Sequence, residues 1–322
     1  MFGLTFLSAT SATTTHRKVP FTFGGTVLNS VAGYVAGGYD GALLDAIDKV
    51  SFPVDTKTTL SATLTSARYA SNGFANSGVA GYVAGGQDSV SYLSNISKIA
   101  FPADTRTTLS ATLSSALAFA GPFANSGVAG YVAGGEKTGG LVSAIDKISF
   151  PADTRTTLSA TLTTACGYLA GFANSGVAGY AAGGEISGGK TNRIDKIAFS
   201  ADTQTTLSAT LTTARSQLAG FANSGIAGYA AGGGDSVGSL SGIDKIAFSA
   251  DTKTTLSATL SSARTQLAGF ANSGTAGYAA GGSVFTSAID KIAFPADTRT
   301  TLSATLTTAR YGVTGFADNG PL

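Results

Sequence analysis

A short motif, Gly-Tyr-x-Ala-Gly-Gly, occurs six times in this chain of 322 residues. Its tyrosines are Tyr34, Tyr82, Tyr131, Tyr180, Tyr229 and Tyr278. Successive tyrosines are 48, 49, 49, 49 and 49 residues apart. Repeats of about 50 residues are typical of units that form β blades, whereas helical solenoids usually have shorter repeats. The repeat therefore indicates a fold assembled from six copies of one small β unit.

Each repeat contains four segments with strand character, which the first repeat illustrates. The GYVAG segment at 33–37 runs into a glycine pair, and the IDKVSF segment at 47–52 precedes a Pro-Val-Asp-Thr turn. In TTLSATL at 58–64, leucine and alanine alternate with threonine and serine, which is typical of a half-buried strand. The GFANSG segment at 73–78 ends in an Asn-Ser-Gly turn. No helical period follows a capping residue, so we predict an all-β chain.

Four strands per repeat predict a six-bladed β-propeller built from four-stranded antiparallel blades. We expect residues 1–26 to form an N-terminal arm and residues 27–322 to form the propeller. The strand count balances if the C-terminal segment from Tyr311 to Asp318 joins the blade that begins at Val31, which would remove the open edges. Residues 26–30 weakly resemble the same strand, so closure from the N-terminus is the alternative. Glycine and alanine should lie near the axis, where inner strands crowd together.

These segments resemble kelch repeats, beginning with the apolar stretch and glycine pair of GYVAGG at 33–38. A closing arginine position is occupied by Arg68, Arg215, Arg264 and Arg310, with Leu117 and Cys166 as departures. Kelch repeats usually carry a tryptophan in the last strand of a blade, and here leucines lie near that place: Leu60, Leu109, Leu158, Leu207, Leu256 and Leu302. The resemblance runs from about residue 27 to the end and implies the propeller fold.

A second resemblance comes from the Ser/Thr/Gly-rich composition, with an I-D-K segment and an A-D-T turn in most repeats. These features look like repeat arrays in virion or tail-fibre-like proteins of marine bacteriophages. That resemblance implies a component of a particle or a host adhesin. Fold alone does not determine function, so the site has to be argued from its residues.

Composition and charge exclude several classes of partner. Charged residues make up 12% of the chain, the net charge is +2, and basic residues lie near acidic ones, so we expect no nucleic-acid partner. No run approaches the roughly 18 apolar residues of a membrane span. The N-terminal segment lacks a basic residue before a short apolar run, so we interpret it as an arm rather than a signal peptide. The single cysteine, Cys166, allows no intramolecular disulfide and is expected to be a buried apolar residue.

Candidates for catalysis are few, so we predict no enzyme activity, cofactor or metal site. The single histidine, His16, lies in the arm, and no cluster has metal-ligand spacing. One repeated set of acids, Asp48, Asp146, Asp195, Asp244 and Asp290, is expected to pair with a neighbouring lysine or with the arginine position of an adjacent blade. A second set, Asp55, Asp104, Asp153, Asp202, Asp251 and Asp297, is expected to cap turns.

The repeats are nearly identical except in two places. One is the loop between the glycine pair and the IDK segment, where we expect a binding face. Its candidate contacts are Tyr39, Tyr92, Lys137, Lys190, Arg193 and Phe285. The other is the short stretch after the arginine position, which differs at Tyr69, Phe119, Tyr168, Gln217, Gln266 and Tyr311. Drift in unconstrained loops is the alternative to recognition.

The function that these features favour is a non-enzymatic structural or binding propeller. It would be a virion component, such as a phage tail or fibre protein, that recognises a partner protein or a host surface glycan through its loops. The arm would join other proteins of a larger assembly, and the location would be virion or extracellular. The alternatives are a polysaccharide hydrolase or lyase using loop acids, and an intracellular kelch adaptor in the cytoplasm. The unrepeated loop acids are Asp40, Asp45, Asp88, Glu136, Glu185 and Asp235.

Overall fold

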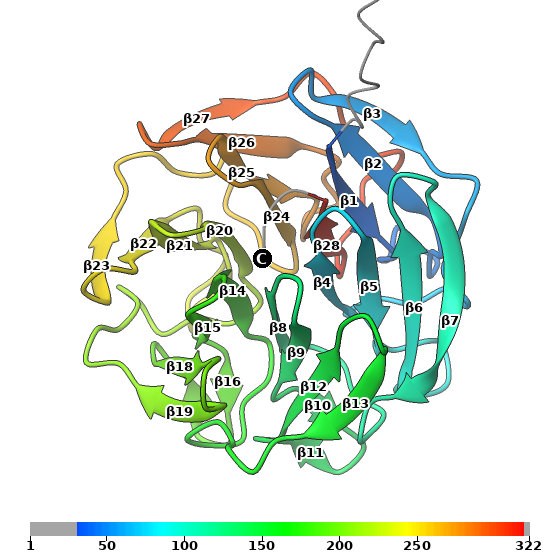
Figure 1. The fold of residues 1–322 in the computed structure, drawn as a ribbon. Helices are drawn as coiled ribbons and strands as arrows, with labels where there is room; N and C mark the ends of the chain where they lie inside the picture. The colour runs from blue at the N-terminus through cyan, green and yellow to red at the C-terminus, as the bar shows by residue number, and fades with distance from the viewer. Residues whose placement is uncertain (1–30, 319–322) are drawn as a thin grey trace, which may run out of the picture.

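The structure, a computed structural model, describes residues 31–318 of the chain. Six four-stranded antiparallel sheets stand around a common axis as the blades of a propeller (Figure 1). Strands and loops account for all of the described residues, without a helix. The predicted all-β, six-bladed architecture is therefore confirmed. In the described range no helix is present that could cross a membrane.

Each blade uses the same four segments in the same order from the axis outward. The innermost strands are β28 (Thr314–Ala317), β4 (Asn72–Asn76), β8 (Gly121–Asn125), β14 (Ala170–Asn174), β20 (Ala219–Asn223) and β24 (Ala268–Asn272). The second strands are β1 (Ala32–Ala36), β5 (Ala80–Ala84), β9 (Ala129–Ala133), β15 (Ala178–Ala182), β21 (Ala227–Ala231) and β25 (Ala276–Ala280). The third strands are β2 (Ile47–Ser51), β6 (Asn95–Ala100), β12 (Ile145–Ser149), β18 (Ile194–Ala198), β22 (Ile243–Ala247) and β26 (Ile289–Ala293).

The outermost strands and two small hairpins complete the fold. The outermost strands are β3 (Thr56–Thr59), β7 (Thr105–Thr112), β13 (Thr154–Thr157), β19 (Thr203–Thr206), β23 (Thr252–Thr255) and β27 (Thr298–Thr301). The hairpins pair β10 (Glu136–Lys137) with β11 (Gly140–Leu141), and β16 (Glu185–Ile186) with β17 (Gly189–Lys190). We number the blades from the one that contains β1, so that blade 2 begins with β4 and blade 6 with β24.

Blade 1 is completed by the C-terminal end of the described chain. Its innermost strand, β28, pairs antiparallel with β1, so that Phe316 lies opposite Tyr34. The Asp318 N–H also donates a hydrogen bond to the Ala32 carbonyl at 2.8 Å. This is the closure that the strand count favoured. The alternative segment, residues 26–30, and the expected arm, residues 1–26, lie outside the described residues.

The outermost strand is shorter than the sequence pattern predicts. In blade 1, β3 ends at Thr59, because its partner β2 begins at Ile47 and offers no strand beyond that point. Leu60 and Leu64 continue as irregular chain, held by N–H bonds to the carbonyls of Ile47 and Asp45 at 2.9 and 2.8 Å. The prediction of a full TTLSATL strand is thus wrong in five blades. Only β7, whose partner β6 begins one residue earlier, extends further.

Aromatic rings join neighbouring blades. The ring of Tyr34 stacks between Phe316 of its own blade and Phe101 of blade 2, with centroids 5.1 Å apart in both pairs. Phe316 in turn fills the space beside Gly81, where an added Cβ would lie 2.1 Å from its ring. The glycine that precedes each motif tyrosine is therefore required by close packing. Equivalent stacks occur at the other blade interfaces, such as Phe74, Tyr82 and Phe150.

The second repeated set of aspartates also joins blades. Asp104 of blade 2 accepts a hydrogen bond from the Tyr34 hydroxyl at 2.8 Å and one from Lys49 Nζ at 2.6 Å, both in blade 1. The expectation that these side chains cap their own turns is wrong, because both carboxylate oxygens are occupied by the preceding blade. The last interface closes the circle, since Asp55 accepts from Tyr278 and Lys291 of blade 6.

The first set of aspartates meets the arginine position, as predicted, in three blades. Asp48 lies 3.1 Å from Arg310, and both side chains are buried. The equivalent buried pairs are Asp244 with Arg215 and Asp290 with Arg264. The partners lie in one blade rather than in adjacent blades. This is because the strand that follows each arginine is the innermost strand of the blade that carries the aspartate.

Two of the other three blades adjust to the missing partner, and in the third the buried Leu117 takes the arginine position. Arg68 has Ser97 in place of an aspartate and donates to Asn95 Oδ1 at 2.6 Å instead. Cys166 replaces an arginine and is fully buried, as expected from the sequence. Its aspartate, Asp195, lies 3.4 Å from Arg193 Nε. Arg193 therefore takes over part of the role of the absent arginine.

Candidate functional site

The innermost strands meet so closely that, in five of the six blades, one position on the strand leaves no room for a side chain and is occupied by glycine. An added Cβ at Gly220 would lie 2.1 Å from the carbonyl oxygen of Gly171, and the same distance separates Gly269 from Gly220 O and Gly315 from Gly269 O. We call these glycines, with Gly73 and Pro122, the collar. Backbone packs on backbone here, as glycine permits. The collar therefore narrows the space along the axis of the ring.

A closed circle of hydrogen bonds lies above the collar, on the face that carries the long loops. One residue from each blade donates its N–H to the carbonyl of the equivalent residue in the preceding blade, with N···O distances between 2.5 and 3.0 Å. The six members are Ala70, Phe119, Tyr168, Gln217, Gln266 and Gly312. All six have a left-handed backbone, with φ between 55° and 65°. We call this ring the mouth circle.

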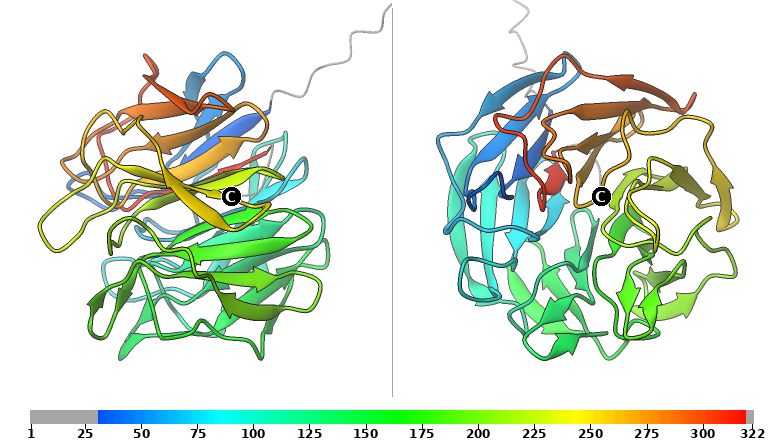
Figure 2. Two further views of the ribbon diagram at one scale, coloured as in Figure 1. Left: turned by 90° about the vertical axis from the view of Figure 1, so that its left-hand side faces the viewer. Right: turned by 180° about the vertical axis from the view of Figure 1, so that it is seen from behind.

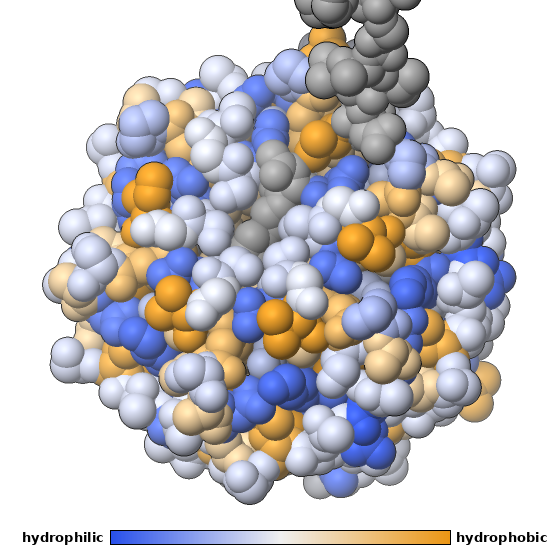
Figure 3. Space-filling view, in the orientation of Figure 1, coloured by the Kyte–Doolittle hydropathy of each residue, from blue (hydrophilic) through white to orange (hydrophobic). Residues whose placement is uncertain are grey.

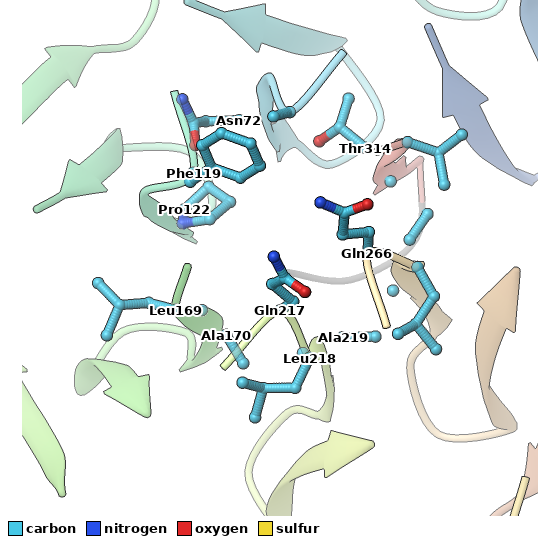
Figure 4. A pocket seen from close by; sticks show the side chains of 18 of the residues that line it. Asn72, Phe119, Pro122, Leu169, Ala170, Gln217, Leu218, Ala219, Gln266 and Thr314 are labelled. Carbon is cyan, nitrogen blue, oxygen red and sulfur yellow. The ribbon is translucent and has the colours of Figure 1, made fainter. Parts of the chain in front are cut away.

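The mouth circle surrounds a funnel that leads to the collar (Figure 4). The outer part of the funnel has a volume of about 490 Å³ and the inner part about 90 Å³. Both parts are lined by Phe119, Tyr168, Gln217 and Gln266. In Figure 4 the side chains of Gln217 and Gln266 point toward the open centre, whereas Leu169 and Leu218 lie farther from it. Both leucines line the inner part of the funnel. The back view in Figure 2 shows the face on which the funnel opens.

Every blade contributes one large side chain to the rim of the funnel, although from two different positions. Phe119, Tyr168, Gln217 and Gln266 come from the mouth circle itself. In the two blades where the circle residue is small, Ala70 and Gly312, the residue before it is a tyrosine. Tyr69 and Tyr311 therefore line the outer funnel in their place. We call the six large residues the mouth residues.

A polar group holds each of two mouth tyrosines. The Tyr69 hydroxyl donates to Gln87 Oε1 at 2.8 Å, and the Tyr168 hydroxyl donates to the carboxylate of Glu136. Burial raises the pKa of Tyr168, and its hydrogen bond to Glu136 raises it further. Burial also raises the pKa of Tyr92, with Glu136 as a second cause. Glu136 thus lies among tyrosine hydroxyls within the funnel.

The six contacts predicted from the sequence fall in different places. Tyr92 lines the outer funnel. Tyr39 and Phe285 form an aromatic group with Tyr311 at the rim, with centroid distances to Tyr311 of 5.5 and 5.2 Å. Phe285 remains 49% exposed and has a φ of 49°. These three aromatic candidates are therefore gathered at the funnel or its edge.

The three basic candidates lie outside the funnel lining. Lys137 follows Glu136 in the hairpin strand β10, where neighbouring side chains point to opposite faces. Lys190 donates to the carbonyl of Asp235 at 2.5 Å and links two loops. Arg193 lies against Asp195, as described above. The funnel therefore draws on aromatic and amide side chains rather than on these cations.

Sequence reasoning did not nominate several residues that line the funnel. Gln87, Ser283 and Val284 come from the variable loops, and the mouth residues come from the second variable stretch. Glu136 was named only among the loop acids of the hydrolase alternative, not as a binding contact. The signal that could have found them was present, because both stretches differ between otherwise similar repeats. What the sequence does not show is that the two stretches of every blade meet at one end of the axis.

The arrangement limits the chemistry that the funnel can perform. Of the unrepeated loop acids, Glu136 alone is among the residues that line the two parts of the funnel. Within residues 31–318, no three His, Cys, Asp or Glu side chains gather as a metal site requires. His16 lies outside the described residues. The geometry provides aromatic faces, amide groups and one carboxylate.

Comparison with known proteins adds no relative. The chain matches no protein-family model, and no curated protein matches it either.

Proposed function

We propose that this protein is a non-enzymatic binding propeller whose funnel recognises a glycan on a host surface. One observation carries the proposal: the two stretches in which the repeats diverge both line the funnel. Elsewhere most of the packing and hydrogen bonding repeats from blade to blade, with exceptions at the arginine position of blades 2, 3 and 4. Divergence concentrated at one concave site is expected where one face recognises a ligand and the rest is scaffold.

Backbone geometry at the mouth supports the same proposal. Phe119, Tyr168, Gln217 and Gln266 have positive φ values, which cost side chains other than glycine roughly 1–2 kcal/mol each. Glycine would avoid this cost, as it does at Gly312 in blade 1. Strained positions that keep large side chains are typical of functional sites. The backbone strain at these four mouth residues supports a role in recognition.

The chemistry of the lining fits a glycan. Aromatic side chains offer apolar faces on which the C–H groups of a sugar ring can pack, with a polar tip where the residue is tyrosine. Gln217 and Gln266 each offer two N–H donors and an acceptor for hydroxyl groups. The outer volume of about 490 Å³ lies in the range of small-ligand sites, roughly 300–1,000 Å³.

Binding is favoured over glycoside hydrolysis. Hydrolysis needs two carboxyl groups, roughly 5–10 Å apart, on either side of the bond that is cleaved. The funnel lining includes a single carboxylate, Glu136, and it already accepts a hydrogen bond from Tyr168. The hydrolase or lyase alternative therefore has less support than recognition.

The biological setting that we propose is a kelch-type propeller in a virion, such as a phage tail or fibre protein. The GYxAGG motif and the buried arginine position support the kelch likeness. The chain enters blade 1 at Ala32, beside Asp318, at the end of the ring opposite the funnel. Residues 1–26 would then join the propeller to its assembly from the side away from the ligand. A cytoplasmic kelch adaptor is the alternative setting.

An array of cell-surface glycans, probed with the full chain, tests the proposal. Gln217→Ala and Tyr69→Ala should each weaken glycan binding at least tenfold, since central contacts in a recognition site are commonly worth about 1.4 kcal/mol or more. The matched control is Val177→Ala, at a 53% exposed residue of the opposite, turn-bearing face. Figure 3 shows that face, with small apolar patches scattered among polar residues. Binding that survives both mouth substitutions, or no binding to any glycan, would overturn the proposal.

A further inference from the structure

The six mouth residues are not distributed evenly by type. Blades 1 to 4 supply the aromatic residues Tyr311, Tyr69, Phe119 and Tyr168, and the next two blades supply Gln217 and Gln266. The Tyr69 ring meets the Phe119 ring edge-on with centroids 5.8 Å apart, and the Phe119 and Tyr168 centroids are 4.1 Å apart. The funnel therefore has a continuous aromatic wall on one side and an amide wall on the other.

Glu136 adjoins the aromatic wall. Its carboxylate accepts a hydrogen bond from the Tyr168 hydroxyl, and it is among the causes that raise the pKa of Tyr92. Its loop follows the glycine pair of blade 3, so its backbone pairs with that of Ala118, next to Phe119. The wall and the carboxylate thus form one surface.

The charge of this surface is not balanced by a basic side chain. Within the described part of the chain, Glu136 forms no ion pair with lysine or arginine. The residues that line the funnel include no lysine, arginine or histidine. Aromatic faces carry negative partial charge and attract cations, and a carboxylate does so more strongly. A ligand with an anionic group would meet repulsion here.

We propose that the aromatic side of the funnel binds an organic ammonium group, held against the wall formed by Tyr69, Phe119 and Tyr168 and beside the carboxylate of Glu136. This inference rests on the proposed function and narrows the ligand to one that carries such a group. Aromatic residues with a nearby acid are suited to alkylammonium ligands because the cation sheds its water against the ring faces. The same chemistry occurs in the free ammonium of an amino sugar and in the quaternary ammonium of a choline headgroup.

Calorimetric titration of the full chain with choline, with glucosamine, and with the neutral carbon isostere of choline tests this inference. At least one of the two cations should bind, and the isostere should bind at least about tenfold more weakly, as expected for loss of a cation–aromatic and ionic contact. Which cation binds more tightly identifies the source of the ammonium group. The same titrations on Glu136→Gln should show a loss of about tenfold in affinity for that cation.

Glu185→Gln provides the matched control. Glu185 occupies the same place after the glycine pair in the next repeat but is not among the residues that line the funnel. This variant should bind as the unmodified protein does, and both variants should keep its melting temperature. Equal binding of cation and isostere, equal effects of the two substitutions, or no binding of either cation would overturn the inference. If the glycan array still depends on Gln217 in that case, the proposed function stands and only the ammonium assignment falls.

Discussion

At the scale of single residues, left-handed backbone conformations occur in two sets of equivalent residues. One is the second set of aspartates, which joins the blades, and the other is the mouth circle. Asp153 has a φ of 53° and uses both carboxylate oxygens, one for the Tyr82 hydroxyl at 2.8 Å and one for Lys98 Nζ at 2.6 Å. Its strain is compensated by charge-assisted hydrogen bonds between blades. Gln217 has a φ of 62°, but its side chain points into the funnel. Here no hydrogen bond or ion pair of the side chain within the described residues compensates the strain.

Substitution of Gln217 by glycine should therefore stabilise the fold while it removes binding. Relief of the positive φ outweighs the greater backbone entropy of glycine in the unfolded chain, so we expect a gain of about 0.5–1 kcal/mol in the free energy of unfolding. Chemical denaturation and the glycan array, applied to the same variant, measure the two effects. A variant that loses stability would show that Gln217 is retained for the fold.

The six motif tyrosines, which lie at the blade interfaces, make the free energy of unfolding depend on pH in the alkaline range. Burial raises the pKa of Tyr34, and the hydrogen bond to Asp104 raises it further. The pKa values of Tyr82, Tyr131, Tyr180, Tyr229 and Tyr278 are raised too, with burial as the largest cause. In the unfolded chain tyrosine ionises near pH 10, so above that pH the unfolded state releases protons that the folded state keeps. The free energy of unfolding is therefore unaffected below about pH 10 and falls above it.

Each of these tyrosines lowers the free energy of unfolding by about 1.4 kcal/mol per pH unit in that range, or about 8 kcal/mol per pH unit for the set. We expect the chain to unfold cooperatively within roughly two pH units above 10, a range that follows from typical domain stabilities. Tyrosinate absorbance and circular dichroism followed together against pH measure this. Ionisation of the interface tyrosines near pH 10, with the β signal unchanged, would show that their hydroxyls are not held as described.

At the scale of strands, the sequence predicts what is local and misses what depends on the ring. The GYxAGG, IDK and GFANSG segments form strands as predicted, because alternation and turn residues act within a few positions. The TTLSATL segment becomes irregular after Thr59, because its length as a strand is set by where β2 begins. The aspartates of the turns bind the preceding blade, and no pattern within one repeat shows which blade that is. Likewise, variable residues were visible in the sequence, but their meeting in one funnel was not.

The collar gives a direct test of how the innermost strands pack. An added methyl group at Gly220 would lie 2.1 Å from Gly171 O, so Gly220→Ala forces β20 and β14 apart. We expect a loss of about 3 kcal/mol or more, at the upper end for overpacked positions. Gly188→Ala is the matched control, since nothing lies within 4 Å of its added Cβ, and it should change stability by less than about 0.5 kcal/mol. Urea denaturation compares the two, and equal effects would contradict backbone-to-backbone packing at the axis.

At the scale of the whole molecule, stability depends on closure. The aromatic stacks, the aspartate contacts and the mouth circle each run through all six blades and return to the first. Near-identical blades can maintain such circles because each interface is a copy of the last. In blade 1 the circle of aromatic stacks depends on β28, which brings Phe316 against Tyr34.

A chain that ends at Val313 should consequently lose the ring. Without β28, strand β1 becomes an open edge and Tyr34 loses one of its two stacking partners. We expect aggregation, or a melting temperature at least 10 °C lower, a drop that corresponds to several kcal/mol in a domain of this size. Light scattering and thermal denaturation measure the change. A control chain that ends at Asp318 should match the full chain, and equal behaviour of the two truncations would argue against C-terminal closure.

The central claim is that this propeller keeps a repeated scaffold for stability and a divergent funnel for recognition. The most direct test gives all six blades the mouth residue and the loop of blade 5, which carries Gln217, and compares glycan binding with that of the unmodified chain. We expect the uniform variant to fold, with a melting temperature within a few degrees of the original, and to lose specific binding. Retained specificity in the folded uniform variant would contradict the claim and place recognition elsewhere on the molecule.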